Sequence, residues 1–530
     1  MRSMLMRYVL VILVCGFSFL RLEAQCPNRP NAGTVVQDAL SVSSANGALN
    51  AELTMRHSVD NAGYTHYCYN YATSKGDVES PTLRLNPGDR LLLDVKDRIE
   101  ADDSAGMMEM PATPGKVCGD GGMMMLSSTN VHFHGLNVPP TCHQDDVLTT
   151  LLQPNDPAFH FNIQIPKNEP PGLYWYHPHV HGFTEFQVNG GAAGALIVEG
   201  MEKFHPEVAG LKERVFVIRQ QYLVPWVPGP YQLTINYQVA ASPSSASPII
   251  DMKPNEKQFW RVANATIQDF LPLQVWFNGV PQKLQLIALD GYPLPQSRPE
   301  ETILIPPAGR AEFIVQAPPQ NNEAIFIALG YSTGPTGNPD LEQQLARIAV
   351  SGNEDEAAEA KQEINAAEPV SQTSMKSIKF AELDKQKPTT LRKLYFSEEF
   401  GGTNGPIQFY ITVDGQKQKV FEANEKPVIT THVGAVEDWI VENHALETHA
   451  FHIHQIHFKV LEVDGKPVTD QDLRDTIEVP FWEGPGHPYH SFKARFDFRD
   501  PTIAGTFVFH CHILLHEDLG MMHKILVLPK

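Results

Sequence analysis

The stretch Thr506–Lys530 reads "TFVFHCHILLHEDLGMMHKILVLPK" and places Cys511 between two histidines. Side chains on a β-strand alternate between its two faces, so His510 and His512 should point one way and Cys511 the other. A further histidine and two methionines follow shortly after. Hydrophobic packing gives no reason for this pattern, which predicts two separate groups of metal ligands on one strand.

Three further segments, "VHFHGLNV", "GLYWYHPHVHG" and "HAFHIHQIHF", also contain histidines two residues apart. The segments that begin at Gly172 and Gly505 form an internal repeat, because each has a Gly, four residues with two aromatics, and then His-x-His. Histidines at this spacing on a strand lie roughly 7 Å apart and suit two neighbouring ions better than one. Four pairs supply eight imidazoles, enough for a cluster of several metals. The pairs are His132 with His134, His177 with His179 or His179 with His181, His452 with His454, and His510 with His512.

The cysteine selects the metal. Imidazole alone binds copper, zinc, iron or nickel. Cys511 faces away from the cluster and so serves a second site, for which His449, His516 and either Met521 or Met522 are available. A His2Cys set with a weak axial methionine is the geometry of a blue copper electron-transfer site, whereas a structural zinc site needs two or more cysteines.

The first residues contain two arginines, the apolar run Tyr8–Leu20 and then the small residue Ala24. A run this short predicts a cleaved secretory signal over residues 1–24, the alternative being a retained membrane anchor. We expect a protein that is secreted or periplasmic, with no membrane partner.

Five cysteines follow the predicted signal. In an oxidising compartment four of them can form two disulfides. Spacing does not fix the connectivity; we expect Cys26 to pair with Cys68 and Cys118 with Cys142, which leaves Cys511 as the free thiol.

Composition and length predict an all-β protein of several domains. A chain of 530 residues is too long to fold around a single hydrophobic core. The net charge of −20 argues against nucleic acid as a partner. Short β-branched and aromatic runs between Gly, Pro, Asn and Asp predict Greek-key β-sandwiches. We expect three similar domains over residues 25–200, 201–352 and 393–530, with a polar, Ala- and Glu-rich linker over 353–392 and metal chemistry shared by the outer two domains.

The motifs "HFHG", "WYHPH", "HAFHIH" and "HCHILLHEDLGMM" together resemble those of the three-domain multicopper oxidases, the family of laccases, bilirubin oxidases and cuprous oxidases. The resemblance extends to "FWRVANAT" and "LIALDGYPL" in the middle domain. It implies three cupredoxin-like domains and four copper ions: one type 1, one type 2 and two type 3. It also implies one-electron oxidation of a substrate coupled to four-electron reduction of dioxygen to water.

Carried over by motif position, the resemblance assigns the ligands of each copper. "WYHPH" favours His177 and His179 over His181, and the tenth position after the cysteine favours Met521 over Met522. The type 2 ligands are His132 and His452; the type 3 ligands are His134, His177, His179, His454, His510 and His512; the type 1 ligands are His449, Cys511, His516 and axial Met521.

The sequence departs from the family in two places. The usual "HPFHIHG" is here "HAFHIHQ", with Ala450 and Gln455 at positions that are not ligands. In the amino-terminal repeat Pro178 stands where Cys511 stands in the other, so the first domain should hold no type 1 site.

Two carboxylates match acidic positions of the family. Reduction of dioxygen to water consumes four protons, which a buried cluster must receive from nearby acids. We expect Glu517 and Asp145 to serve this catalytic role, with Asp146 as the alternative to Asp145.

A loop between Gly106 and Met125 reads "GMMEMPATPGKVCGDGGMMM". Thioether sulfur selects cuprous copper, so the loop could gather that ion; the favoured interpretation is that flexible methionines fill an irregular gap. The methionines are Met107, Met108, Met110, Met123, Met124 and Met125.

We expect an exported, laccase-like oxidase whose phenolic or similar reductant delivers electrons beside an exposed edge of His516, from which they pass through Cys511 to the cluster that reduces dioxygen. The alternatives are a cuprous-ion oxidase that detoxifies copper and a non-catalytic copper-binding or coat protein.

Overall fold

The computed structural model describes residues 25–60, 63–100, 118, 124–154, 156–222, 231–242, 245–320, 323–351, 378–401, 407–469 and 472–530. The predicted signal over residues 1–24, most of the methionine-rich loop and the Ala- and Glu-rich part of the linker lie outside these residues. None of the helices in the described ranges is long and apolar enough to cross a lipid bilayer.

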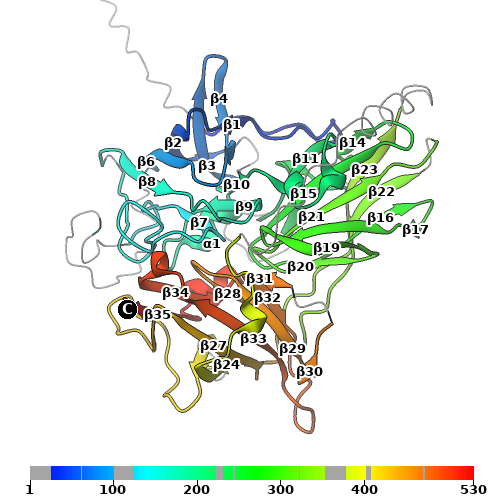
Figure 1. Cartoon of the computed structure of the whole chain (residues 1–530). Helices are drawn as coiled ribbons and strands as arrows, with labels where there is room; N and C mark the ends of the chain where they lie inside the picture. Colours follow the sequence, from blue (N-terminus) through cyan, green and yellow to red (C-terminus); the bar gives the residue numbers. More distant parts are fainter. Residues whose placement is uncertain are drawn as a thin grey trace, which may run out of the picture.

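The fold is all-β, as predicted, with six sheets packed as three two-sheet domains (Figure 1). The first domain packs the sheet β4-β3-β2-β6-β8 on the sheet β1-β5-β10-β9-β7. Its elements are β1 (Ser41–Ser43), β2 (Ala48–Val59), β3 (Thr65–Thr73), β4 (Gly76–Glu79), β5 (Thr82–Leu85), β6 (Arg90–Arg98), β7 (His132–His134), β8 (Phe159–Gln164), β9 (Gly172–His177), α1 (Thr184–Asn189) and β10 (Gly194–Val198), followed by the 3-10 turns η1 (Met201–Lys203) and η2 (Pro206–Val208).

The second domain, green in Figure 1, packs the sheet β13-β12-β11-β15-β21-β18-β19 on the sheet β14-β23-β22-β16-β17. Its strands are β11 (Lys212–Tyr222), β12 (Tyr231–Ile235), β13 (Gln238–Val239), β14 (Ile249–Met252), β15 (Lys257–Ala265), β16 (Leu271–Phe277), β17 (Val280–Pro281), β18 (Leu284–Leu289), β19 (Tyr292–Glu300), β20 (Ile303–Ile305), β21 (Arg310–Gln316), β22 (Ala324–Ala328) and β23 (Gln343–Val350).

The third domain, yellow to red in Figure 1, packs the sheet β25-β24-β27-β33-β29-β30 with β31 on the sheet β26-β35-β34-β28-β32. Its elements are η4 (Leu383–Lys385), β24 (Thr390–Phe400), β25 (Ile407–Val413), β26 (Ile429–His432), β27 (Ala435–Asn443), β28 (His449–Ile453), β29 (Phe458–Val463), β30 (Lys466–Pro467), β31 (Leu473–Arg474), β32 (Thr476–Val479), β33 (His490–Phe498), η5 (Pro501–Ile503), β34 (Gly505–Cys511), α3 (Leu514–Asp518) and β35 (Met522–Leu528).

The three domains repeat one pairing pattern. In each, an early strand lies parallel to the next long strand, which is antiparallel to a third: β2, β6 and β8; β11, β15 and β21; β24, β27 and β33. The internal repeat of the sequence corresponds to equivalent strands, because β9 lies between β10 and β7 as β34 lies between β35 and β28. The outer domains therefore present their histidine strands from equivalent sheets.

Two segments pack differently from what the predicted domain boundaries imply. One, from the predicted first domain, packs on the second domain, and the other, from the predicted linker, packs on the third. Val35 forms a β-bridge with Ile249, and Val36 belongs to the core of the second domain. Ile378 and Phe380, within the predicted linker 353–392, already pack into the core of the third domain. Apolar side chains at these positions find a buried surface in the neighbouring domain, which length and composition do not reveal.

The disulfides pair as predicted. Cys26 is bonded to Cys68 and Cys118 to Cys142. Cys511 is the free cysteine among the described residues, and it is buried.

A buried ion pair joins the three domains where they meet. Arg310 of the second domain donates to both carboxylate oxygens of Asp475 of the third, at 2.7 and 2.5 Å, and to the Leu173 carbonyl of the first. Both charged side chains are fully buried. Burial raises the pKa of Asp475, but the guanidinium outweighs this and lowers it to about 2.

This pair gives a stability prediction. Arg310→Met should lower the free energy of unfolding of the copper-free protein by about 3–5 kcal/mol, because it leaves a buried carboxylate unpaired. Arg298→Met is a matched control, because Arg298 also bridges the second and third domains, to Asp472, but with a partly exposed side chain; it should cost about 1 kcal/mol or less. Urea denaturation measures both, and equal losses would contradict the importance assigned to Arg310.

Candidate metal centres

Eight of the predicted histidine ligands converge between the first and third domains. Strand β7 pairs with β9 so that His132 lies opposite His177, and β28 pairs with β34 so that His452 lies opposite His510. The two strand pairs face each other near the centre of the molecule (Figure 1). All eight side chains are buried. Neither domain supplies the complete set.

The eight rings form one continuous cluster, in which two sets of three come from both domains. His134, His177 and His512 have ring centroids 5.2–5.7 Å apart. His179, His454 and His510 have ring centroids 4.8–5.3 Å apart. The remaining two, His132 and His452, are 6.2 Å apart and stack on rings of the opposite domain, on His454 and His134. His132 also lies 5.3 Å from both His134 and His177, so all eight rings belong to one cluster, and several groups of three donors within it could each hold a metal ion.

Several imidazole nitrogens of this cluster have no hydrogen-bond partner and are therefore available to bind a metal. His132, His177 and His452 each engage Nδ1, with Asp145, the Pro178 carbonyl and the Asp475 carbonyl. Their Nε2 atoms are buried and have no hydrogen-bond partner. An imidazole fixed through one nitrogen, with the other free in a buried space, is typical of a metal ligand. Burial also lowers the pKa of His132 well below its ordinary value, which favours the neutral form that binds metals.

His181, the alternative member of the third pair, packs instead with its ring against Phe421, 4.9 Å between centroids. The structure thus brings His177 and His179 into the cluster.

The second group lies on the opposite face of the same strand. Cys511 belongs to the apolar core of the third domain with Phe507 and Phe509. Its Sγ lies 3.6 Å from Nδ1 of His449 and 3.9 Å from Nδ1 of His516, and these two nitrogens are 3.3 Å apart. One sulfur and two nitrogens therefore converge on a single buried point, which is the donor set of a type 1 copper.

The two candidate axial methionines lie in different environments. Met521 is fully buried in the same apolar core as Cys511, and its carbonyl accepts the Cys511 amide at 3.0 Å. Met522 begins β35 opposite His510 and packs with Val147 and Val508 on the other face. The placement favours Met521.

His516 has no exposed edge, in contrast to the expectation from the sequence. The side chain is 3% exposed, and Phe409 stacks on the ring at 4.0 Å between centroids. Its Nε2 lies 3.6 Å from Glu447, and Nε2 of His449 lies 3.4 Å from Glu398. Burial, and then the neighbouring Glu398, raise the pKa of Glu447 to about 8.

Sequence reasoning missed both of these glutamates. Glu447 stands two residues before His449, so its proximity to the ligand was a usable signal. Glu398 comes from β24, and nothing in its local sequence indicates that the strand reaches the site.

Both predicted catalytic carboxylates touch ligands of the cluster. Oδ1 of Asp145 is 3.0 Å from Nδ1 of His132, whereas Asp146 accepts the amides of the following turn, Leu148 and Thr149. Burial raises the pKa of Asp145 to about 8, although hydrogen bonds from the Phe133 amide and the Gln455 side chain act to lower it. Glu517 on α3 is fully buried, with Oε2 3.1 Å from Nδ1 of His510.

Helix α3 is held in place by the first domain. Asp518, the residue after Glu517, accepts the backbone amides of Gly182, Thr184 and Glu185 at the start of α1. The contact fixes the Glu517 side chain relative to His179, whose Nε2 lies 3.5 Å from Oε1.

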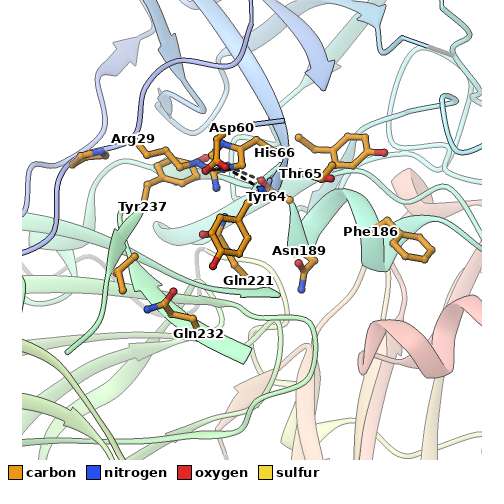
Figure 2. A pocket seen from close by; sticks show the side chains of 14 residues that line it. Arg29, Asp60, Tyr64, Thr65, His66, Phe186, Asn189, Gln221, Gln232 and Tyr237 are labelled. Atoms are coloured by element: carbon orange, nitrogen blue, oxygen red, sulfur yellow. Dashed lines mark hydrogen bonds and ion pairs between the residues drawn. The ribbon is translucent and has the colours of Figure 1, made fainter. Parts of the chain in front are cut away.

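Two other features lie apart from the metal ligands. Of the six loop methionines only Met124 and Met125 are described, and both are half-buried. A cavity of about 220 Å³ lies between the first and second domains (Figure 2). Of its charged groups, Arg29 is engaged with Glu79 and the Gly190 carbonyl and stacks on Tyr237, and Asp60 is paired with His66. These contacts serve domain packing.

A chain that gathers eight histidines between two β-sandwich domains, with a His2Cys group behind them, has the ligand set of a copper redox protein. Family models described as multicopper oxidase match residues 124–203, 211–353 and 401–530. A multicopper oxidase of Staphylococcus haemolyticus is 24% identical over 499 residues, covering 88% of this chain and 90% of that protein. A laccase of Bacillus subtilis is 23% identical over 446 residues, covering 75% and 79%.

Among solved structures, a multicopper oxidase from Campylobacter jejuni, described as a metallo-oxidase, superposes with a TM-score of 0.69 at 22% identity and covers 95% of this chain and 96% of that one. The chain belongs to the multicopper oxidase family. It is an oxidoreductase with copper as its cofactor.

Replacement of the thiol tests the second group. Cys511→Ser should abolish the intense blue absorption and substrate oxidation, because the thiolate ligand is lost, while the cluster histidines still bind copper. Absorption spectroscopy and copper content measure the two effects. A variant that stays blue and active would contradict the assignment of Cys511.

Replacement of the buried acid tests the proton supply. Glu517→Gln should slow dioxygen reduction by about 100-fold without loss of copper or of electron uptake at the Cys511 site. Stopped-flow reduction and steady-state turnover separate the two steps. Asp145→Asn should slow turnover similarly, and Asp146→Asn is the control, since its carboxylate faces a turn; a larger effect at Asp146 would reverse the assignment.

Proposed function

We propose that the protein is an exported, laccase-like oxidase that takes electrons one at a time from a small reductant and reduces dioxygen to water. The observation that carries this proposal is the position of Cys511: its side chain lies with His449 and His516, while its two sequence neighbours lie in the eight-histidine cluster. Four coppers, one at the Cys511 group and three in the cluster, match the donors available.

Copper bound at these residues would supply the one-electron transfers and the reduction of dioxygen. The chain itself joins the two groups by a single peptide bond on each side of Cys511, the shortest covalent connection that alternation of a strand allows. Glu517 lies against His510 and Asp145 against His132, and these are the acids placed to deliver protons. Burial of all the ligands excludes bulk water from the cluster.

Export is supported by the amino-terminal segment and by the two disulfides, which persist in oxidising compartments. A secreted or periplasmic oxidase meets small reductants rather than cytoplasmic cofactors.

Dioxygen uptake by the pure, copper-loaded protein tests the proposal. Phenolic reductants should drive uptake with a stoichiometry of four electrons per dioxygen. Absence of uptake with phenols and with cuprous ion would instead support a non-catalytic copper-binding protein.

A second candidate is oxidation of a metal cation, and a specific observation favours it. Glu398 and Glu447 line the outer nitrogens of His449 and His516, and Phe409 covers the ring that a phenol would approach. Burial and Glu398 raise the pKa of Glu447 to about 8, and a bound cation would favour its ionised form. Carboxylates suit ferrous ion better than the softer cuprous ion. Ferrous and cuprous ions therefore both belong in the comparison.

Glu447→Gln separates the two candidates. If a cation is the reductant, loss of a charge-assisted contact of about 1.5–3 kcal/mol should raise its KM by roughly 10- to 100-fold while phenol turnover stays within about twofold. Glu399→Gln, at an exposed position of β24 next to Glu398, is the control and should change neither. Equal loss with both reductants would show that Glu447 acts on the His516 site itself.

A further inference from the structure

Gln455 departs from the family motif and also from ordinary backbone geometry. Its φ is +60°, in the left-handed region that glycine adopts without strain. A glutamine at such a position persists when its surroundings hold it there. The residue is 1% exposed, so whatever its side chain contacts lies inside the protein.

The side chain contacts one of the proton-delivering acids. Nε2 of Gln455 donates to Oδ2 of Asp145 at 2.6 Å across the interface between the third and first domains. The other oxygen, Oδ1, accepts the amide of Phe133 at 2.9 Å, and both oxygens face Nδ1 of His132, at 3.0 and 3.1 Å. The carboxylate is thus held at one oxygen by its own domain and at the other by Gln455.

The backbone of Gln455 is fixed in turn by the first domain. Its carbonyl accepts Nδ2 of Asn137 at 3.0 Å. Two bonds across one interface, one from the side chain and one to the main chain, orient the amide toward Asp145. Rotation of the side chain alone cannot keep this contact if the interface shifts.

A cavity of about 300 Å³ borders this residue. Gln455 and Asn137 form part of its wall, with Lys379, Arg499 and Asp500 among the charged groups. Gln455 is therefore in contact both with Asp145 and with the cavity.

We propose that Gln455 is a positioning residue that fixes the Asp145 carboxylate on His132 at the interface of the first and third domains, beside the cavity that Gln455 lines. The inference rests on the proposed function in so far as Asp145 delivers protons to the dioxygen-reducing cluster. The contact itself, and its effect on a ligand of the cluster, do not depend on the reductant.

Gln455→Gly is the first variant. Glycine removes the amide but relieves the left-handed backbone, which offsets part of the lost hydrogen bond, so the protein should still fold. We expect a several-fold lower kcat for dioxygen reduction, an unchanged KM for the reductant, unchanged blue absorption, and an altered electron paramagnetic resonance signal of the copper held by His132. An unchanged signal together with unchanged kcat would overturn the proposal.

Gln455→Met keeps the length of the side chain without the donor, and should give the same altered signal. Arg499→Gln is the matched control: Arg499 lines the same cavity but pairs with Asp497, and its replacement should leave the signal unchanged. An effect of Arg499→Gln as large as that of Gln455→Gly would assign the change to the cavity rather than to the contact.

A double-mutant cycle on the copper-free protein separates this inference from the proposed function. Gln455→Met and Asp145→Ala should have non-additive effects on the free energy of unfolding, because each removes the same hydrogen bond. Additive effects would overturn the contact. If no reductant supports dioxygen uptake, the cycle and the resonance signal still decide the role of Gln455.

Discussion

The alternation of side chains along β34 is the constraint on which both metal groups depend. Because neighbouring residues face opposite sides, Cys511 points into the core of the third domain while His510 and His512 point at the first domain. The same strand thereby belongs to a hydrophobic core and to an interface. A shift of one residue in its pairing with β28 would exchange the two faces and disassemble both groups at once.

The second domain contributes none of the predicted ligands, yet it fixes the cluster. Its Arg310 binds Asp475, and the Asp475 carbonyl accepts Nδ1 of His452. His457, beside the cluster motif, also contacts Asp290 of the second domain. The second domain thus acts as a support that orients histidines of the third domain through a buried ionic network.

Periodicity and motif spacing predicted the all-β fold and the His-x-His pairs around a lone Cys511, whereas the resemblance to the family selected His177 and His179 over His181 and Met521 over Met522. These features depend on local sequence, since His-x-His on a strand defines its own geometry. The covering of His516 by Phe409, the approach of Glu398 and the bond from Gln455 to Asp145 depend instead on how distant strands and domains pack. The packing of Val36 on the second domain has the same origin. No periodicity in a single sequence encodes such contacts.

The division of the histidines between the two ends of the chain also has a consequence for folding. The first strands of the cluster leave the ribosome or the translocon long before β34 exists, so the complete donor set forms only after the last residues have folded onto the first domain. Copper that binds this late site stabilises the closed arrangement of the domains by mass action, by an amount that grows with the free copper concentration. The metal then stabilises the domain interface in addition to its role as a cofactor. Heat or protease should open the interface between the first and third domains more readily when copper is scarce.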